Sequence, residues 1–179
     1  MPSTKAAARK WARDVHQVLR EHEVRQVATV PDAGLIRLLE IVAGDTGMRL
    51  VTLTSEEEGI ALAAGAWLGG QRSALLMQSS GVGNCINMLS LPALCGIPLL
   101  MIVTMRGEWG EFNPWQVPMG QAVRPVLAAM GVKLFPVEHE DEVGPAVAAA
   151  AGIAFNGGLQ AAVLLTQRML GAKRFADQE

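Results

Sequence analysis

Three adjacent carboxylates, Glu56, Glu57 and Glu58, head a predicted helix that is made almost wholly of small residues. Two ordinary effects explain part of this run. Ser55 and Glu58 have the spacing of a capping box, and acidic residues in a first turn complement the positive end of the helix dipole. Neither effect requires three neighbouring carboxylates, whose mutual repulsion opposes full ionisation. One of the three is therefore a candidate for proton chemistry.

The helix behind these carboxylates, predicted over residues 56–68, carries glycine and alanine where a solvated helix would carry charged residues. Gly65 lies in its middle, where glycine costs up to about 1 kcal/mol relative to alanine. The close approach of another backbone or of a flat ligand would explain this glycine, and so would tight packing against a second helix. The two explanations are compatible.

A second candidate follows a predicted strand, where the glycine-rich segment 79–84 is predicted to be a loop. Gly81 and Gly83 would let the backbone approach a ligand closely, and Asn84 can cap the next helix. The segment fails as a dinucleotide fingerprint because Ile86 occupies the third glycine position, and no Lys-Ser/Thr pair follows to make a phosphate-binding loop. It is either a ligand-binding loop or a plain glycine-rich turn.

Arg106 stands just past a continuously apolar predicted strand, 98–105, and begins a long loop, 106–120, that is rich in glycine and proline. An arginine in this place can clamp an anionic group with two parallel hydrogen bonds. It can equally pair with Glu108 or Glu111 of the same loop. Arg106 is thus a candidate for substrate binding or for a local ion pair.

Strands and helices alternate along the chain, and the middle strands are apolar throughout, which is typical of a parallel sheet covered on both faces. We expect a single three-layer α/β domain over residues 1–179, with about six mostly parallel strands and a short C-terminal tail, 168–179. Ligands in such sheets bind beyond the carboxyl ends of the strands. The predicted strands are 24–30, 48–54, 73–78, 98–105, 132–138 and 161–166, and the predicted helices are 5–21, 35–43, 56–68, 85–95, 121–130 and 141–155.

Composition narrows the possible partners. Hydrophobic residues make up 50% of the 179 residues, the net charge is −2, and no aromatic residues alternate with the basic ones, so we expect no nucleic-acid partner. Glycines and prolines interrupt the uncharged stretch between Arg72 and Arg106, so we expect no membrane span. Cys85 and Cys95 would lie about 15 Å apart along one helix, too far for a disulfide. Without a metal-ligand spacing or a signal peptide, the chain is expected to lack a metal site and to be cytoplasmic.

Four stretches together resemble the pyrimidine-binding domain of thiamine-diphosphate-dependent 2-oxo acid decarboxylases. The resemblance runs from about residue 30 to residue 137. Its four stretches are VPDAGL, SEEEGIALAAGAWLGG, LLMQSSGVGNCINML and MRGEWGEFNPWQVPMG. A glutamate nine residues ahead of a helix glycine, here Glu56 and Gly65, is shared by the whole superfamily. The last two stretches resemble more specifically the branch that acts on sulfopyruvate and phosphonopyruvate.

The resemblance implies a role for each matching residue. Glu56 would be the cofactor-activating glutamate, hydrogen-bonded to N1′ of the aminopyrimidine and favouring its imino tautomer. Asp32 would handle a proton or position the substrate, although an Asx turn also explains it. Arg106 and Gln116 would face the substrate. The remaining cofactor-binding residues implied by the match are Gln78, Ser79, Ser80, Gly81, Val82 and Asn84.

Three departures from this pattern leave the exact 2-oxo acid open. Gln116 stands where phosphonopyruvate decarboxylases carry a histidine, Ser79 where they carry an asparagine, and Ala66 where a tyrosine often follows the helix glycine.

The resemblance also implies a partner. The superfamily holds the diphosphate through a divalent metal with a Gly-Asp-Gly motif, whereas this chain has only GDTG at 44–47, where a helix-ending turn explains it. The binding site for thiamine diphosphate and Mg²⁺ would therefore be completed by a beta subunit that carries the diphosphate-binding domain. The predicted helix 85–95 has no charged side chain on any face and must be covered. We therefore also expect self-association into a dimer or larger assembly.

The expected function is that of the pyrimidine-binding subunit of a decarboxylase for a short 2-oxo acid with a second anionic group, such as 3-sulfopyruvate. One alternative is a phosphonopyruvate decarboxylase, another 2-oxo acid decarboxylase or a carboligase on the same scaffold. A second alternative is a non-catalytic α/β module that holds a nucleotide-like ligand at residues 79–84, with Arg106 beside a phosphate.

Overall fold

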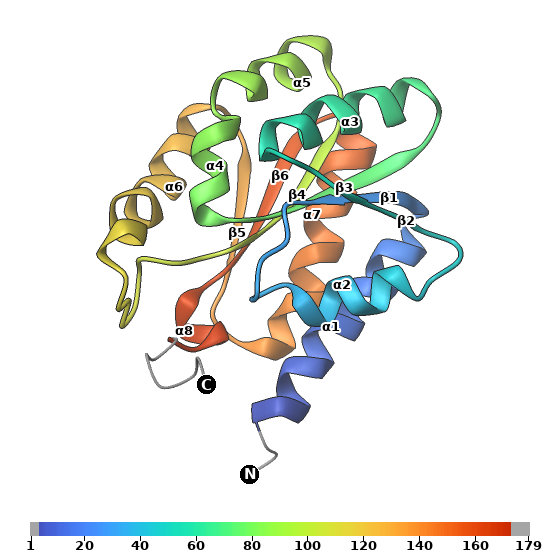
Figure 1. The fold of residues 1–179 in the computed structure, drawn as a ribbon. Helices are drawn as coiled ribbons and strands as arrows, with labels where there is room; N and C mark the ends of the chain where they lie inside the picture. The colour runs from blue at the N-terminus through green and yellow to red at the C-terminus, as the bar shows by residue number, and fades with distance from the viewer. Residues whose placement is uncertain (1–3, 173–179) are drawn as a thin grey trace.

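A single parallel sheet forms the centre of the computed structural model, which describes the backbone of residues 4–172 and the side chains of residues 10–172. Its strand order is β2-β1-β3-β4-β6-β5, and every neighbouring pair is parallel (Figure 1). This confirms the predicted sheet. The strands are β1 (Val24–Thr29), β2 (Arg49–Thr52), β3 (Arg72–Gln78), β4 (Leu99–Thr104), β5 (Lys133–Val137) and β6 (Gln160–Leu165).

Helices cover both faces of the sheet, which completes the three layers (Figure 1). One face carries α1 (Thr4–Glu21), α2 (Ile36–Ala43) and α7 (Val143–Gly157). The other face carries α3 (Glu56–Leu68), α4 (Ser79–Cys85), α5 (Ser90–Cys95) and α6 (Val117–Ala129). The short elements are α8 (Gln167–Leu170), η1 (Asn87–Leu89), η2 (Pro114–Gln116) and η3 (Glu140–Glu142).

Two apolar clusters, one on each side of the sheet, make up the core. Successive residues of β3 alternate between them: Leu75 and Met77 pack under α3 and α4, whereas Ala74 and Leu76 pack under α1, α2 and α7. Because neighbouring strand residues point to opposite faces and both faces are covered, a central strand must be apolar at every position. This explains the uninterrupted hydrophobic runs of the sequence.

The topology predicts a crevice at the carboxyl ends of the central strands. Strands β1 and β3 are neighbours, but the chain leaves β1 toward β2 and leaves β3 toward β4, in opposite directions across the sheet. Such a switch point leaves an opening beyond the carboxyl ends of the two strands, where α/β proteins bind ligands. The loops after β1, β3 and β4 meet there.

The segment 79–84, predicted as a loop, is helical in the structure and forms most of α4. Tertiary packing overrides the low helix propensity of its glycines, because α4 is packed against α3 and α6. The predicted helix 85–95 is also wrong as a single element, since it is divided among α4, η1 and α5. Pro92 has no amide hydrogen for a hydrogen bond to the preceding turn, which favours this break.

Two helix starts differ from the sequence-based expectations. Helix α6 begins at Val117 and not at residue 121, because Pro118 lies in its first turn, where the missing amide hydrogen costs nothing. The predicted capping box between Ser55 and Glu58 is replaced by a similar arrangement one residue earlier. Glu58 accepts hydrogen bonds from the backbone amide of Thr54, at 2.9 Å, and from its hydroxyl.

The predicted tail, 168–179, begins within α8, and its residues 173–179 lie outside the described part of the chain.

Candidate active site

Glu56 is the buried member of the three-glutamate run, with 8% of its surface exposed. It opens α3, and its Oε2 atom accepts a hydrogen bond of 2.8 Å from the side-chain amide of Asn84 in α4. The carboxylate lies against the backbone of Gly81, where any β-carbon would overlap it. The close approach that the sequence suggested for this glycine is therefore made by Glu56 itself.

The other two glutamates are exposed and belong to the helix start. Glu57 lies at the surface in the first turn of α3. The hydroxyl and amide of Thr54 donate to Glu58 and hold the pKa of that carboxyl below its usual range. Capping and the helix dipole thus explain Glu57 and Glu58. They do not explain a carboxylate turned inward at Glu56.

A cleft of about 770 Å³ opens beside Glu56. Its lining comes from the start of α3, from α4, from η2 and from the first turn of α6. Trp115 forms an apolar rim, with 83% of its surface exposed. The cleft therefore pairs a buried carboxylate with flat and apolar surfaces, and it is lined by Glu56, Ser80, Gly81, Asn84, Pro114, Trp115, Pro118 and Met119.

Six of the residues predicted to act on the cofactor or the substrate lie outside the lining of this cleft, and they are Gln78, Ser79, Val82, Gln116, Asp32 and Arg106. Val82 is fully buried in the core beneath α4, and the buried Ser79 hydroxyl accepts a hydrogen bond of 3.1 Å from the amide of Arg106. Gln78 connects neighbouring loops. Gln116 is partly buried, and its Oε1 atom is enclosed without a hydrogen-bond partner among the described residues.

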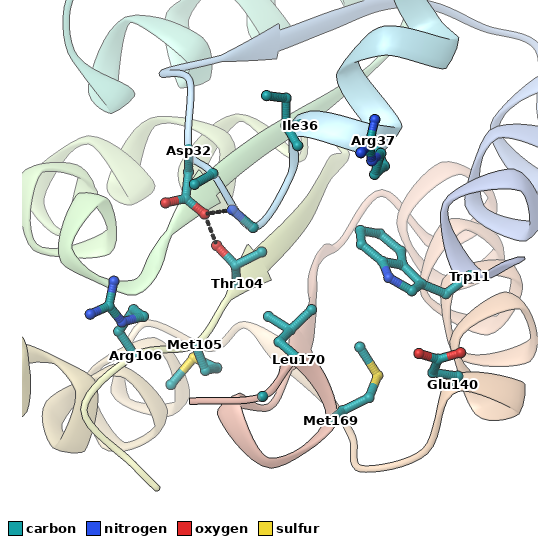
Figure 2. Close-up of a pocket in the computed structure, with 13 residues that line it drawn as sticks. Trp11, Asp32, Ile36, Arg37, Thr104, Met105, Arg106, Glu140, Met169 and Leu170 are labelled. Carbon is teal, nitrogen blue, oxygen red and sulfur yellow. Dashed lines mark hydrogen bonds between the residues drawn. The ribbon is translucent and has the colours of Figure 1, made fainter. Parts of the chain in front are cut away.

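Asp32, in the loop after β1, lies in a second pocket of about 320 Å³ (Figure 2). Its carboxylate accepts three hydrogen bonds: from the Gly34 amide at 2.8 Å, the Gln78 side chain at 2.8 Å and the Thr104 hydroxyl at 3.0 Å. The first is the Asx turn that the sequence offered as an alternative. The other two tie the ends of β1, β3 and β4 together. A carboxylate has about four acceptor sites, so among the described residues capacity for a further donor remains.

A chain of hydrogen bonds connects the cleft with this second pocket. Ser80, which lines the cleft, donates to the Gln78 Oε1 atom at 2.9 Å, and Gln78 donates to Asp32. The side chain of Gln78 thus connects the Glu56 side of the site to the Asp32 side. The amide can make both contacts because it carries an acceptor and a donor on one group.

Arg106 lines the second pocket and is paired with Glu111. Its Nε and Nη2 atoms donate to the two Glu111 oxygens at 2.6 and 2.5 Å. The pairing with Glu111 that the sequence allowed as an alternative is therefore present. The two side chains are only 14% and 3% exposed, so the pair is buried and does not lie at the surface. The hydrogen bonds from Arg106 lower the pKa of Glu111 to about 2, and the same contacts raise the pKa of Arg106.

Gln167 is a site residue that the sequence did not reveal. It is 1% exposed at the start of α8, just after β6. Its Oε1 atom accepts from the amides of Glu108 and Trp109, both at 3.0 Å, and its Nε2 atom donates to Glu111 at 2.8 Å. No local pattern announces such a residue, because its partners lie more than 50 positions away in the sequence.

Three further observations bear on cofactors and location. Within residues 4–172 no cluster of three His, Cys, Asp or Glu residues could hold a metal ion. Asp45 of the GDTG segment accepts from the Gly47 amide at 2.8 Å and contacts His16 at 2.7 Å, so it secures a turn against α1. No helix in the same described range is long and apolar enough to cross a membrane.

Comparisons with known proteins agree on one family. Residues 9–112 match the family described as thiamine pyrophosphate enzyme, N-terminal TPP binding domain. The chain is 36% identical over 152 residues to sulfopyruvate decarboxylase subunit alpha of Methanococcus maripaludis, which covers 84% of this chain and 91% of the relative. It is 45% identical over 89 residues to phosphonopyruvate decarboxylase of Streptomyces viridochromogenes, or 49% of this chain and 22% of the relative.

The fold is similar to that of a solved enzyme. The 2-oxoglutarate:ferredoxin oxidoreductase from Magnetococcus marinus matches with a TM-score of 0.73 over 90% of this chain and 29% of that chain. Because the sequences are only 18% identical, this likeness shows the fold alone.

Proposed function

The chain belongs to the thiamine pyrophosphate enzymes, in which it matches the N-terminal TPP binding domain, and from this premise we propose that it is the pyrimidine-binding alpha subunit of a thiamine-diphosphate-dependent 2-oxo acid decarboxylase. The substrate that we propose is 3-sulfopyruvate, which would lose CO₂ to give sulfoacetaldehyde. This assignment is supported by relatives named as alpha subunits of sulfopyruvate decarboxylase, which match most of the chain.

The observation that carries the proposal is the setting of Glu56. One oxygen of this buried carboxylate is held by Asn84, and the other has no hydrogen bond from the described residues, while Glu56 lines the cleft. A buried carboxylate costs free energy unless a donor pairs with it. The protonated N1′ of an aminopyrimidine is such a donor, and Glu56 would hold the proton at that atom.

The residues of the cleft fit the cofactor's pyrimidine end. Gly81 and Ser80 give a low wall, Asn84 fixes the carboxylate, and Trp115 with Met119 gives an apolar wall against a flat ring. Bound thiamine diphosphate supplies the electron sink for the loss of CO₂. The chain's own residues orient the ring and hold the proton at N1′. Gln78, Ser79 and Val82 would act from behind this surface by fixing α4 and the neighbouring loops.

The second pocket is where we place the substrate. Asp32 would position the 2-oxo acid and handle a proton, and its three hydrogen bonds hold its carboxylate in one orientation. Arg106 would bind the distal anion, and Gln116 would contact the substrate from the same loop. Phosphonopyruvate is the second candidate, because a phosphonopyruvate decarboxylase is 45% identical to this chain over 89 residues.

A partner is proposed for the diphosphate and for Mg²⁺, which would be held by a beta subunit with the diphosphate-binding domain. The surface of α3 and α5 supports an association, either with that subunit or with a second copy of this chain. Leu68 and Leu94 are 80% and 87% exposed, and a β-carbon added to Gly65 would meet no atom of the described chain within 4 Å. Burial of these two leucines in an assembly would remove apolar surface from water. The free thiols of Cys85 and Cys95 are consistent with a cytoplasmic enzyme.

Reconstitution tests the proposed function. The chain is assayed for CO₂ release with sulfopyruvate, phosphonopyruvate and pyruvate, each with and without the beta subunit, thiamine diphosphate and Mg²⁺. We expect decarboxylation only in the complete mixture and the highest kcat/KM with sulfopyruvate. Full activity of the chain alone would contradict the two-subunit proposal. Cofactor binding that does not depend on Glu56, without turnover of any 2-oxo acid, would favour the binding-module alternative.

A further inference from the structure

The buried side chain of Gln167 helps to fasten the loop after β4 to the rest of the fold. Gln167 accepts hydrogen bonds from the amides of Glu108 and Trp109 and donates one to the Glu111 side chain. It thus contacts three residues of the segment 107–111. A buried amide with its donor and acceptor both satisfied has one low-energy orientation. The loop therefore carries Glu111 in a fixed place.

Glu111 in turn fixes the orientation of Arg106. The carboxylate occupies the side edge of the guanidinium, made by Nε and Nη2, and the ring of Phe112 lies 5.7 Å from the guanidinium carbon. A planar guanidinium has a second two-nitrogen edge, made by Nη1 and Nη2, that can bind another anion side by side with the first. Within residues 10–172 the Nη1 atom of Arg106 donates no hydrogen bond.

Arg106 lines a pocket that it shares with Asp32, which is also proposed to act on the substrate. Arg106, Asp32 and Thr104 line the same cavity, and the negative charge of Asp32 contributes to the raised pKa of Arg106. Figure 2 shows Arg106 on the same side of the cavity as Asp32 and Thr104, with Met169 and Leu170 on another wall. A ligand in this cavity would meet the guanidinium and the Asp32 carboxylate together.

We propose that Glu111, held by Gln167, is a positioning residue that presents the Nη1–Nη2 edge of Arg106 to the sulfonate or phosphonate of the substrate. This inference rests on the proposed function and adds specificity to it. The selectivity for a 2-oxo acid with a second anionic group depends on a side chain that does not itself touch the substrate. Glu111 acts only through Arg106.

Two physical views of Glu111 predict opposite results. If only charge mattered, removal of the Glu111 carboxylate would leave Arg106 unneutralised and would tighten the binding of an anion. If orientation matters, the released guanidinium loses its fixed geometry, and anion binding weakens in spite of the gained positive charge. The sign of the effect therefore distinguishes positioning from electrostatics.

The test compares Glu111→Gln and Gln167→Leu with a matched control, Gln160→Leu. Gln160 is also a buried glutamine, at the opposite end of β6, and it donates to the Ile97 carbonyl at 3.3 Å, remote from the site. Each variant is assembled with the beta subunit, Mg²⁺ and thiamine diphosphate. KM and kcat are measured for sulfopyruvate and pyruvate. The affinity for sulfoacetate, an unreactive sulfonated acid, is measured by calorimetry on the same complexes.

We expect KM for sulfopyruvate to rise about tenfold or more in Glu111→Gln and in Gln167→Leu, as for a lost charge-assisted hydrogen bond. The kcat with pyruvate should stay close to that of the wild type. The Kd for sulfoacetate should rise by about the same factor as the KM for sulfopyruvate. Gln160→Leu should match the wild type in all three measurements. Tighter sulfoacetate binding in Glu111→Gln, or unchanged selectivity, would overturn the inference. A wild-type complex that binds sulfoacetate but does not decarboxylate sulfopyruvate would instead reject the proposed substrate.

Discussion

The Glu56 carboxylate rests on the backbone of Gly81, and the two residues are 25 positions apart in the sequence and on different helices. No side chain larger than hydrogen fits at residue 81 without moving the carboxylate. The contact explains why α4 tolerates a glycine in its first turns, where that residue lowers helix propensity. The proposed cofactor-activating carboxylate can thus occupy its position only because residue 81 has no side chain.

Gly81→Ala should displace the Glu56 carboxylate and weaken the interaction with the cofactor. We expect at least about a tenfold loss of activity in the reconstituted enzyme, since a displacement of about 1 Å in a catalytic geometry is costly. Steady-state kinetics and calorimetric titration of thiamine diphosphate into the complex measure the loss.

Gly152→Ala is the matched control, because a β-carbon on Gly152 of α7 meets no atom of the described residues within 4 Å. Alanine in that helix should leave activity unchanged and stabilise the fold by about 0.5–1 kcal/mol. Equal activity of both variants would mean that Glu56 adapts and that the contact with Gly81 is not required.

The ion pair between Arg106 and Glu111 makes stability depend on pH in a defined window. Because the pKa of folded Glu111, about 2, lies below the ordinary value of 4.5, the ionised carboxylate stabilises the fold above pH 4.5. That contribution is lost as the pH falls from 4.5 toward 2. The stability difference between the wild type and Glu111→Gln should be about 2 kcal/mol larger at pH 6 than at pH 3. Urea unfolding at both pH values measures it, and a pH-independent difference would contradict the buried pair.

The two cysteines should differ strongly in reactivity. Burial raises the pKa of Cys85 to about 12, with the charges of Glu56 and Glu57 adding to the shift, whereas Cys95 is exposed on α5. The thiolate is the reactive species, so iodoacetamide at pH 8 should add one group to the isolated chain, at Cys95. Mass spectrometry of the peptides identifies the site.

The same reagent tests the proposed contact surface on α5. If that surface is covered in the assembled enzyme, Cys95 should be protected once the beta subunit is added or the chain self-associates. Unchanged labelling in every assembly would place the contact elsewhere.

The sequence predicted most of the architecture because local patterns determine it. Helix α3 has the predicted bounds, since its composition and its start signals agree, and the apolar strands could only form a covered parallel sheet. The segment 79–84 was misread because glycines favour a loop, while the contacts that make it helical, with Glu56 and with Met119, lie far away in the sequence.

The candidate site divides in the same way. Glu56, Asp32 and Arg106 could be singled out from residue type and place at strand ends or helix starts. Gln167 could not, because its role depends on how the end of β6 meets the loop after β4. The partner of Arg106 could only be narrowed to Glu108 or Glu111. The structure pairs Glu111 with Arg106, and it pairs Glu108 with Arg124 at 3.1 Å.

The most direct test of the central proposal is proton exchange at C2 of thiamine diphosphate in the assembled enzyme, with Glu56→Gln compared against Glu57→Gln. Glutamine keeps the size of either side chain, but it cannot hold the N1′ proton as a carboxylate does. Glu57 is an exposed neighbour on the same turn. Deuterium exchange followed by NMR should be slower by orders of magnitude in Glu56→Gln and unchanged in Glu57→Gln. Exchange at the wild-type rate in Glu56→Gln would contradict the assignment of Glu56 as the cofactor-activating residue.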